Sequence, residues 1–424
     1  MTFKVLSAKK LQGSIELPAS KSYSIRAFFV AACGGSSTLI APSDCDDAKV
    51  ALRVARAFGA KVTRTGRKYF IEPSRAVALR KSLAVDVGES GTSLRFVLPL
   101  LPFYSRTARV SGKGTLVGRP NGHLCEALRG CGLDIKGIGP KESVPISFKG
   151  GEIKGGLISV DGSVSSQFIS ALMIACPRAV GNTRLLLTGK ELVSRDYIVM
   201  TRQILARAGI RILQRSAREF VIPGGQEFDG LQDFHVPSDY GLAAFFMVAA
   251  ALLDSDVTLK GKFDNSLVQS DGAILGFLRK MGVRMKRTGQ AIHIQGPALL
   301  KGGVFSLKDC PDLVPIMAVA AMFAKGQTHL KDIGHARVKE SDRISDLRKE
   351  LLKVGARIEE RPGELIIYPQ DSYKKGVALD PHHDHRLAMA FAVLGLRVGV
   401  SVKDMECTAK SYPGFVKALR SLGA

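Results

Sequence analysis

Six short polar segments along this chain, here called tips, are each followed directly by an apolar segment of helical length. Repetition at this spacing indicates one supersecondary unit copied six times. The six tips are Lys21-Ser22, Ser90-Gly91-Thr92, Ser165-Ser166-Gln167, Ser238-Asp239, Pro311-Asp312 and Asp384-His385-Arg386. Successive tips are 69, 75, 73, 73 and 72 positions apart when counted from Ser22, Gly91, Ser166, Asp239, Asp312 and Asp384.

A second periodic mark is a basic amphipathic segment that ends in a glycine. Glycine just past a helix end is the usual left-handed C-cap, so each of these segments is predicted to be a helix. Alternating residues after each glycine predict a strand. Each unit should therefore combine strands with one buried helix and one helix that faces solvent. The glycines are Gly59, Gly132, Gly209, Gly282, Gly355 and, at the truncated end, Gly423.

The six tips predict six helix N-termini of similar construction. Each N-terminus offers unpaired backbone N–H groups and the positive end of a helix dipole, and such ends bind anions. If they converge, the place they face should bind a strongly negative ligand. The alternative is a structural repeat without chemical meaning, which the repeat alone does not exclude.

The predicted fold class is α/β, with six units divided as three and three. A chain of 424 residues exceeds what a single core usually supports, which is about 250–300 residues. The polar, glycine-rich segment 224–237 is the best boundary. We expect one domain at residues 20–236 and a second made of 1–19 plus 237–424, because 11–17 reads as a strand that completes the second half.

Composition narrows the class of protein. The net charge of +23 suggests nucleic-acid binding. Against this alternative, the cations are spread over all the basic helices, Trp is absent and aromatics make up only 7%. We therefore expect small anionic partners and no nucleic acid, although such substrates account for only a few of the cations.

The cellular setting is predicted from what the sequence contains. Seven cysteines without any Cys-x-x-Cys pair favour a reducing cytoplasm over a disulfide framework. The longest apolar run, 242–253, falls short of the ~20 residues needed to span a bilayer. The N-terminus has no signal-peptide pattern. We expect a cytoplasmic protein with no membrane partner.

The first tip contains candidate anion-binding residues. Lys21 and Ser22 open a predicted helix, and Arg26 follows Ser22 one turn later on the same face. An ammonium, a hydroxyl and a guanidinium could then meet one anion. Gly91 lies in a turn into a helix, where glycine allows a ligand close to the backbone. Arg119 precedes another helix start. Each of these features is also compatible with ordinary capping and solvated cations.

The third tip is more specific. Ser165, Ser166 and Gln167 stand at the start of a wholly apolar helix, which is the arrangement of a phosphate cradle. Capping alone would need only one serine. Ser194 and Tyr197 lie in the next loop along the chain and could add hydroxyl donors.

The fifth and sixth tips carry carboxylates. Asp312 stands at the N-terminal end of an apolar helix, where its carboxylate could act as a general base. The segment 337–343 holds three cations and two carboxylates ahead of a helix, as a solvated helix start also would. The segment 382–386, His-His-Asp-His-Arg, suggests a metal site, but adjacent histidines on one element are poorly placed for tetrahedral ligation, so we expect no metal.

Taken together, these motifs resemble the 3-phosphoshikimate 1-carboxyvinyltransferases, the 5-enolpyruvylshikimate-3-phosphate (EPSP) synthases of the shikimate pathway of aromatic amino-acid and chorismate biosynthesis. The resemblance runs from Leu17 to Pro413. Its motifs are Lys21-Ser22-x-x-x-Arg26, Gly91-Thr92-x-x-Arg95, Arg119-Pro120, Asp161-Gly162-Ser163-x-Ser165-Ser166-Gln167, Pro311-Asp312, Val338-Lys339-Glu340-Ser341-Asp342-Arg343, Asp384-His385-Arg386 and Cys407-Thr408-Ala409-Lys410.

The resemblance implies a fold and a reaction. The family's fold has two domains of three repeated β/α units, with the buried helices aimed at the interdomain cleft. Its reaction transfers the enolpyruvyl group of phosphoenolpyruvate to the 5-hydroxyl of 3-phosphoshikimate and releases phosphate. It implies no metal or organic cofactor, and we expect a monomer. The sister enzyme that acts on UDP-N-acetylglucosamine is the rival, but no Cys lies in segment 112–118, where that enzyme usually has one.

The resemblance also implies roles for individual residues. Asp312 would accept the hydroxyl proton, Glu340 would serve the methylene carbon, and Lys21 would join them in catalysis. The 3-phosphoshikimate ligands would be Lys21, Ser22, Arg26, Ser165, Ser166, Gln167, Ser194, Tyr197, Asp312 and Lys339. The phosphoenolpyruvate ligands would be Lys21, Gly91, Arg119, Gln167, Arg343, Arg386 and Lys410.

Three residues depart from the family pattern. Glu89 and His335 stand where many relatives carry Asn, and Phe96 stands where they carry Pro. The departures bear on phosphoenolpyruvate affinity and on sensitivity to glyphosate, the family's inhibitor. Because Gly91 is retained, we expect glyphosate to inhibit.

Overall fold

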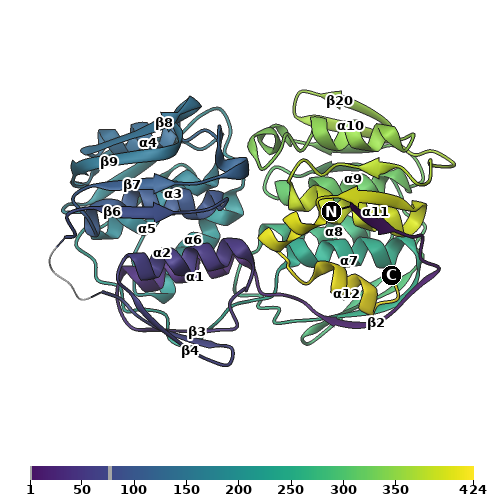
Figure 1. Cartoon of the computed structure of the whole chain (residues 1–424), viewed down its shortest axis with the longest axis horizontal. Helices are drawn as coiled ribbons and strands as arrows, with labels where there is room; N and C mark the ends of the chain where they lie inside the picture. The colour runs from purple at the N-terminus through teal and green to yellow at the C-terminus, as the bar shows by residue number, and fades with distance from the viewer. Residues whose placement is uncertain (1, 75–78) are drawn as a thin grey trace. The chain divides into compact units, whose positions relative to one another are not determined.

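The computed structural model describes residues 2–74 and 79–424 and divides into two compact units (Figure 1). We call residues 20–236 the N-terminal unit. Residues 1–19 together with 237–424 form the C-terminal unit. None of the described helices is long and apolar enough to cross a membrane.

Five four-stranded sheets share one topology. In each, two parallel strands are followed by an antiparallel hairpin on the side of the second strand. In the N-terminal unit, the strand orders are β14 (Phe234–His235), β3 (Ser37–Ile40), β5 (Lys68–Glu72), β4 (Lys61–Thr65); β6 (Leu83–Asp86), β7 (Ala108–Ser111), β9 (Ser143–Gly151), β8 (Leu133–Gly139); and β10 (Gly156–Asp161), β11 (Thr183–Thr188), β13 (Glu219–Ile222), β12 (Leu213–Ser216). In the C-terminal unit, they are β2 (Lys10–Glu16), β15 (Asp254–Lys260), β17 (Ala291–Gly296), β16 (Met285–Thr288); and β18 (Val304–Ser306), β19 (Thr328–Lys331), β21 (Glu364–Tyr368), β20 (Arg357–Arg361).

The sixth sheet is completed by the other end of the chain. It contains the parallel pair β22 (Ala378–Leu379) and β23 (Val400–Lys403), but the described chain has no hairpin after them. The strand β1 (Thr2–Val5) pairs antiparallel with β23 in the place that a hairpin strand occupies elsewhere. The N-terminal segment therefore supplies the third strand of the truncated sixth repeat.

Two strands are exchanged where the chain passes from one unit to the other. The strand before the first tip, β2, pairs parallel with β15, and the strand before the fourth tip, β14, pairs parallel with β3. Ala19 and Ser238 form an isolated bridge, and the Asp239 N–H donates to the Pro18 carbonyl at 3.0 Å. The two chain passages are thus held together at their C-terminal-unit ends.

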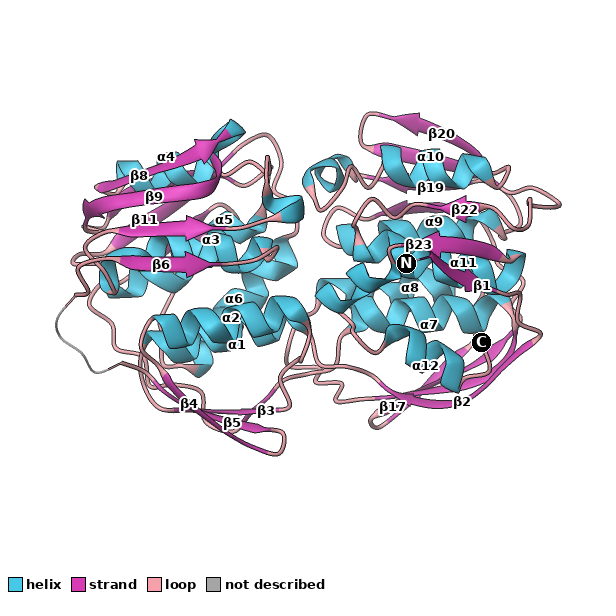
Figure 2. Cartoon of the chain, in the orientation of Figure 1, coloured by secondary structure: helices cyan, strands magenta, loops and turns pink. Residues whose placement is uncertain are grey.

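One helix follows each tip, and these helices form the cores. Because they are apolar on all sides they can lie only between other elements, and α7 is buried at every residue. Figure 2 shows helices packed together inside each unit, with strands along the outside. The helices are α1 (Lys21–Cys33), α3 (Gly91–Leu100), α5 (Ser166–Ala175), α7 (Tyr240–Leu252), α9 (Val314–Met322) and α11 (His385–Val398).

A second set of helices is half-exposed and ends as the sequence predicts. The six glycines adopt φ between 82° and 102°, so the C-cap prediction is confirmed for all of them. Strands follow the first five, as expected. The helices are α2 (Asp46–Ala57), α4 (Gly122–Gly130), α6 (Arg195–Arg207), α8 (Ile274–Lys280), α10 (Ser345–Lys353) and α12 (Phe415–Ser421).

Candidate active-site residues

The first tip presents a cation that is already paired. The Lys21 Nζ lies 3.1 Å from Asp47 Oδ2, and both side chains are largely buried. Lys21 opens α1, and Asp47 lies in the first turn of α2. The carboxylate orients the ammonium group and offsets its charge, so an anionic ligand would bind an ammonium that is held in place.

Arg26 is buried among hydroxyl and carbonyl groups of the N-terminal unit. Its guanidinium donates to Thr201 Oγ1 at 2.8 Å, to the Ser22 carbonyl at 3.1 Å and to Ser170 Oγ at 3.3 Å. It also donates to the Tyr197 carbonyl at 3.4 Å. Burial lowers the pKa of Arg26 to about 10. A cation buried without a carboxylate partner among the described residues is suited to an anion.

The second and third tips are joined by hydrogen bonds. Gln167 Nε2 donates to Thr92 Oγ1 at 3.1 Å, and Arg95 Nη1 donates to Gln167 Oε1 at 3.4 Å. Both pairs are about one repeat apart in sequence, so corresponding helix starts lie side by side. A Cβ added at Gly91 would lie 2.5 Å from Arg95 Nη1 and 3.0 Å from Arg119 Nη1. The missing side chain is therefore what lets two guanidinium groups approach this backbone.

The predicted hydroxyl cradle lies at the start of α5. Ser165 is the N-cap, and its Oγ accepts from the Gln167 N–H at 3.2 Å. Ser166 is the first helical residue and is buried. Ser194 stands at the N-cap position of α6, which packs on α5, but its side chain makes no capping hydrogen bond, and its backbone is left-handed with φ of 53°. Ser194 and Tyr197 thus belong to the start of a neighbouring helix.

In the C-terminal unit, one buried guanidinium contacts three carboxylates. Arg343 Nη1 donates to Asp312 Oδ1 at 2.6 Å, Nη2 to Glu340 Oε2 at 2.8 Å, and Nε to Asp384 Oδ2 at 2.7 Å. Burial by itself lowers the pKa of Arg343, but these carboxylates raise it well above its ordinary value. Arg343 therefore stays charged and fixes the distance between Asp312 and Glu340.

Asp312 is shared between two arginines. Its second oxygen accepts from Arg386 Nη2 at 2.9 Å, and the same nitrogen lies 4.0 Å from Asp271 Oδ2. The Nε and Nη1 atoms of Arg386 are buried and have no hydrogen-bond partner among the described residues. Burial, followed by the charge of Asp312, raises the pKa of Asp271 to about 8.

The remaining predicted residues of this unit lie around Glu340. Lys410 Nζ is 4.0 Å from Glu340 Oε1, and the Lys410 side chain is buried. Lys339 precedes Glu340 and is half-buried. The structure therefore gathers Asp312, Glu340, Arg343, Arg386 and Lys410 into one cluster.

Comparison with known proteins identifies the family. The profile of EPSP synthase (3-phosphoshikimate 1-carboxyvinyltransferase) matches residues 5–419. The chain belongs to the EPSP synthase family. A 3-phosphoshikimate 1-carboxyvinyltransferase of Methanosarcina mazei is 35% identical over a match covering 99% of this chain and 97% of the relative.

Solved structures agree with the family assignment. An EPSP synthase from Acinetobacter baumannii has a TM-score of 0.80 and 27% identity, covering 99% of this chain and 98% of the other. The enolpyruvyl transferase NikO from Streptomyces tendae has a TM-score of 0.78 at 17% identity, over 100% of this chain and 97% of its own, which shows the shared fold. The predicted family, α/β fold and enzyme class are confirmed, and the UDP-N-acetylglucosamine alternative is not favoured.

The three departures from the EPSP synthase pattern have structural consequences. The Phe96 ring lies 5.4 Å from the Arg26 guanidinium, so it forms one wall around that cation. Glu89 Oε2 accepts from Thr115 Oγ1 at 3.4 Å. Burial, followed by the charge of Lys339, lowers the pKa of His335 to about 3. His335 is therefore neutral near pH 7 and adds no cation to this part of the unit.

The fourth tip and the histidine segment have local roles. Asp239 Oδ1 accepts from the Leu242 N–H at 3.0 Å, so the fourth tip caps α7. His382 contacts Glu350, whereas His383 contacts Asp404. Neighbouring histidines in this EPSP synthase relative thus have different carboxylate partners.

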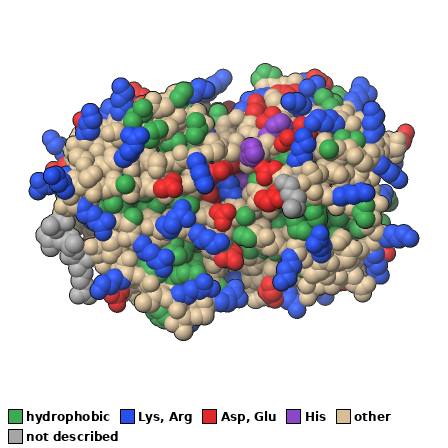
Figure 3. Space-filling model, in the orientation of Figure 1, with side chains coloured by type: hydrophobic (Ala, Val, Ile, Leu, Met, Phe, Trp, Pro, Cys, Tyr) green, Lys and Arg blue, Asp and Glu red, His purple; other side chains and the backbone are tan. Residues whose placement is uncertain are grey.

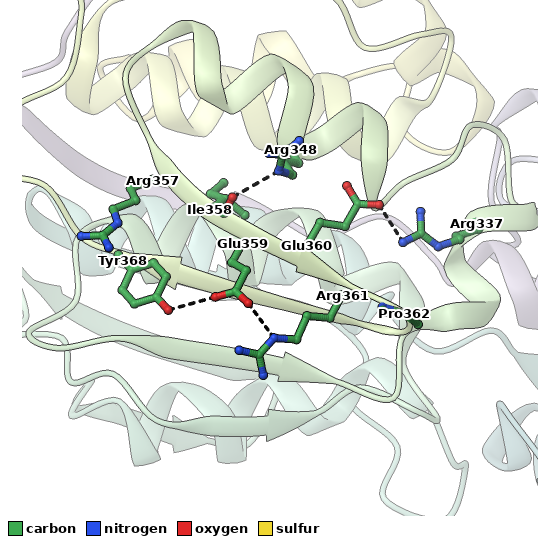
Figure 4. A pocket seen from close by; sticks show the side chains of 9 residues that line it. All are labelled: Arg337, Arg348, Arg357, Ile358, Glu359, Glu360, Arg361, Pro362 and Tyr368. Carbon is green, nitrogen blue, oxygen red and sulfur yellow. Dashed lines mark hydrogen bonds and ion pairs between the residues drawn. The ribbon is translucent and has the colours of Figure 1, made fainter.

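A pocket elsewhere in the C-terminal unit is also rich in arginine. It has a volume of about 830 Å³ and lies over β20 and β21 (Figure 4). Arg337 is paired with Glu360 at 2.7 Å, and Arg361 is paired with Glu359 at 2.7 Å. Two of its four arginines are thus paired with glutamates, while Arg348 donates to the Ile358 carbonyl and Arg357 lies over the Tyr368 ring. Apart from Arg337 of segment 337–343, the pocket contains none of the candidate residues.

Several polar neighbours of the EPSP synthase motifs were not predicted. Asp47 pairs with Lys21, Asp271 lies near Arg386, and Asp384 contacts Arg343. Asp384 stands in a motif, but its partner is 41 positions away. Asp47 lies in the amphipathic helix α2, and Asp271 lies in the short 3-10 helix Ser270–Ala273; neither belongs to a motif. The sequence contains no signal for these pairings, because they join different elements.

Proposed function

We propose that this chain transfers the enolpyruvyl group of phosphoenolpyruvate to the 5-hydroxyl of 3-phosphoshikimate, giving 5-enolpyruvylshikimate 3-phosphate and phosphate. The observation that carries the proposal is the guanidinium of Arg343, which donates to Asp312 and Glu340 at once. The reaction needs one group to take a hydroxyl proton and another to exchange a proton with carbon. Two carboxylates held apart on one arginine meet that need.

The chemical steps use the two carboxylates separately. Glu340 donates a proton to the methylene carbon of phosphoenolpyruvate, and the adjacent carbon becomes cationic. The 5-hydroxyl oxygen adds to that carbon while Asp312 accepts its proton. Glu340 then removes a proton from the new methyl group, the C–O bond to phosphate breaks, and the enol ether forms. The departing phosphate takes up the hydroxyl proton, which returns Asp312 to its carboxylate form. Lys21 supplies a cation that stabilises the negative charge developing on phosphate.

Hydrogen bonds from arginines hold Asp312 in place before the reaction steps begin. Arg343 and Arg386 both donate to Asp312 in the structure described above. An anion that binds these guanidinium groups shares their donors and leaves Asp312 lone pairs free to accept the hydroxyl proton. The buried Nε and Nη1 atoms of Arg386, which have no hydrogen-bond partner among the described residues, are suited to that anion.

The two substrates are assigned to different groups of residues. We assign 3-phosphoshikimate to the hydroxyl-rich residues of the N-terminal unit together with two residues of the C-terminal unit. These are Lys21, Ser22, Arg26, Ser165, Ser166, Gln167, Ser194, Tyr197, Asp312 and Lys339. We assign phosphoenolpyruvate to the cation-rich group: Lys21, Gly91, Arg119, Gln167, Arg343, Arg386 and Lys410. The N-terminal unit would mainly bind shikimate phosphate, and the C-terminal unit would supply the catalytic carboxylates.

The setting of the reaction is also proposed. We propose that the chain works in the cytoplasm as a monomer on small anionic substrates, and that glyphosate inhibits it. On the face drawn in Figure 3, Lys and Arg side chains are dispersed over both units instead of forming one patch. This dispersal supports small anions over nucleic acid as partners.

One measurement tests the proposal. Purified protein is mixed with phosphoenolpyruvate and 3-phosphoshikimate, and inorganic phosphate is measured. Release only with UDP-N-acetylglucosamine as acceptor would overturn the substrate assignment. No release with either acceptor, together with DNA binding whose logarithmic affinity falls linearly with logarithmic salt, would instead favour a polyanion-binding protein.

A further inference from the structure

Asp384 is a fully buried carboxylate, and both of its oxygens accept hydrogen bonds from Arg343. Its Oδ1 accepts from the Arg386 N–H at 2.8 Å and so caps α11. Its Oδ2 accepts from Arg343 Nε at 2.7 Å and from Ser341 Oγ at 3.3 Å. Oδ1 therefore combines the helix cap with a long contact from Arg343 Nη2 at 3.4 Å, whereas Oδ2 accepts the shorter hydrogen bond from Nε.

The contact between Asp384 and Arg343 sets the orientation of the planar Arg343 guanidinium. Nη1 of this guanidinium donates to Asp312, Nη2 donates to Glu340 at 2.8 Å and to Asp384 Oδ1 at 3.4 Å, and Nε donates to Asp384 Oδ2. A guanidinium has its donors in a fixed plane, so fixing Nε fixes the directions of the other two nitrogens. Among the charges that raise the pKa of Arg343, Asp384 is the largest contributor.

We propose that Asp384 is a positioning residue of the reaction, which holds Arg343 so that one guanidinium contacts Asp312 and Glu340 together. This inference rests on the proposed function and deepens it. Asp384 itself is not assigned to touch either substrate. Its effect passes through Arg343, which belongs to the phosphoenolpyruvate group.

Two substitutions separate this role from capping. In Asp384→Asn, the amide oxygen can still cap α11, but the NH₂ group then faces Arg343 Nε, and two donors oppose each other. In Asp384→Ser, the hydroxyl can cap the helix, and Arg343 Nε loses its carboxylate. The matched control is Asp239→Asn, because Asp239 is also buried and caps α7 at the corresponding tip.

The first experiment measures steady-state kinetics and urea denaturation for the three variants. We expect kcat/KM for phosphoenolpyruvate to fall about 100-fold in Asp384→Asn, the usual size of effect for a small misplacement in an active site. The KM for 3-phosphoshikimate should stay within about twofold of wild type, and the denaturation midpoint should match that of Asp239→Asn. An Asp239→Asn variant with the same kinetic loss would overturn the proposal.

The second experiment is a double-mutant cycle with Arg343→Lys. If Asp384 acts through the guanidinium, Asp384→Asn should have at least about a tenfold smaller effect in the Lys background, since coupled residues are non-additive. Effects that multiply would refute the role, and so would failure of both Asp384 variants to fold. A wild-type protein without phosphate release would refute the proposed function itself, which is a different outcome.

Discussion

Asp312 Oδ2 accepts a hydrogen bond from Arg386 Nη2 at 2.9 Å, although the two residues are 74 positions apart. That separation is about one repeat, so the contact joins the fifth tip to the sixth. The same relation joins Gln167 to Thr92, which are 75 positions apart, in the other unit. Stacking of successive copies therefore brings equivalent helix starts together and concentrates their polar groups.

Asp312→Asn should reduce kcat by about 100- to 10,000-fold, the usual contribution of a general base. The amide keeps the shape of the carboxylate, so the KM for 3-phosphoshikimate should change far less than kcat. Steady-state phosphate release checks both values. The control is Asp332→Asn, an exposed aspartate in a left-handed conformation that asparagine tolerates. Equal losses in both variants would contradict the assignment.

Lys21→Met should weaken binding and turnover together. The ammonium group is held by Asp47 at 3.1 Å, so its loss removes a cation from the substrates and leaves a buried carboxylate unpaired. We expect kcat/KM to fall for both substrates. Lys49→Met removes an exposed lysine that lies 3.7 Å from Asp46 and should behave like wild type. Full activity of Lys21→Met would refute the role of Lys21.

Gly91→Ala should raise the KM for phosphoenolpyruvate more than it lowers kcat. The new methyl group would lie 2.5 Å from Arg95 Nη1 and 3.0 Å from Arg119 Nη1, so at least one guanidinium must move. Gly276→Ala is the matched control, since it adds a methyl group to α8 with nothing within 4 Å. That control should be more stable by about 0.5–1 kcal/mol and equally active. An unchanged KM in Gly91→Ala would count against the prediction.

Ser166→Ala and Ser165→Ala should differ in stability but share a kinetic effect. Both should raise the KM for 3-phosphoshikimate if the start of α5 binds its phosphate. Ser165 also caps α5, so its replacement should cost about 1 kcal/mol of unfolding free energy, whereas Ser166→Ala should cost less. Isothermal titration with 3-phosphoshikimate and urea denaturation separate the two effects. Wild-type affinity in both variants would rule out the cradle.

Asp271→Asn should change how stability depends on pH. Burial and the charge of Asp312 raise the pKa of Asp271 from 3.8 to about 8, while Arg386 and Arg343 oppose the shift and Asp239 adds to it. Between these pH values the folded state holds a proton that the unfolded state has lost. The contribution of Asp271 to the free energy of unfolding is therefore largest below about pH 4, and it is lost as the pH rises towards 8.

The variant lacks this titration, so its unfolding free energy should decline less than that of wild type between about pH 5 and pH 8. Urea denaturation at both pH values measures the difference. Asp332→Asn, the same change at an exposed position, serves as control. Parallel pH dependence in wild type and Asp271→Asn would show that Asp271 is ionised in the folded state.

The sequence by itself determined the repeat, the helix starts and the helix ends. Apolar segments after each tip had to be buried helices, and glycines such as Gly59 had to take positive φ, because both features depend on nearby residues. Motifs at the tips were sufficient to identify the family. Lys21, Asp312 and Glu340 all belong to motifs that carry the family resemblance.

Only the tertiary structure decided which strands and charges meet. Nothing in the local pattern of β1 says that it pairs with β23, and nothing around Asp384 says that its partner is Arg343. These contacts join segments far apart in the chain, and their geometry arises from the stacking of copies and from strand exchange. Periodicity fixes which face of an element is buried, whereas the partner on that face is set by packing in three dimensions.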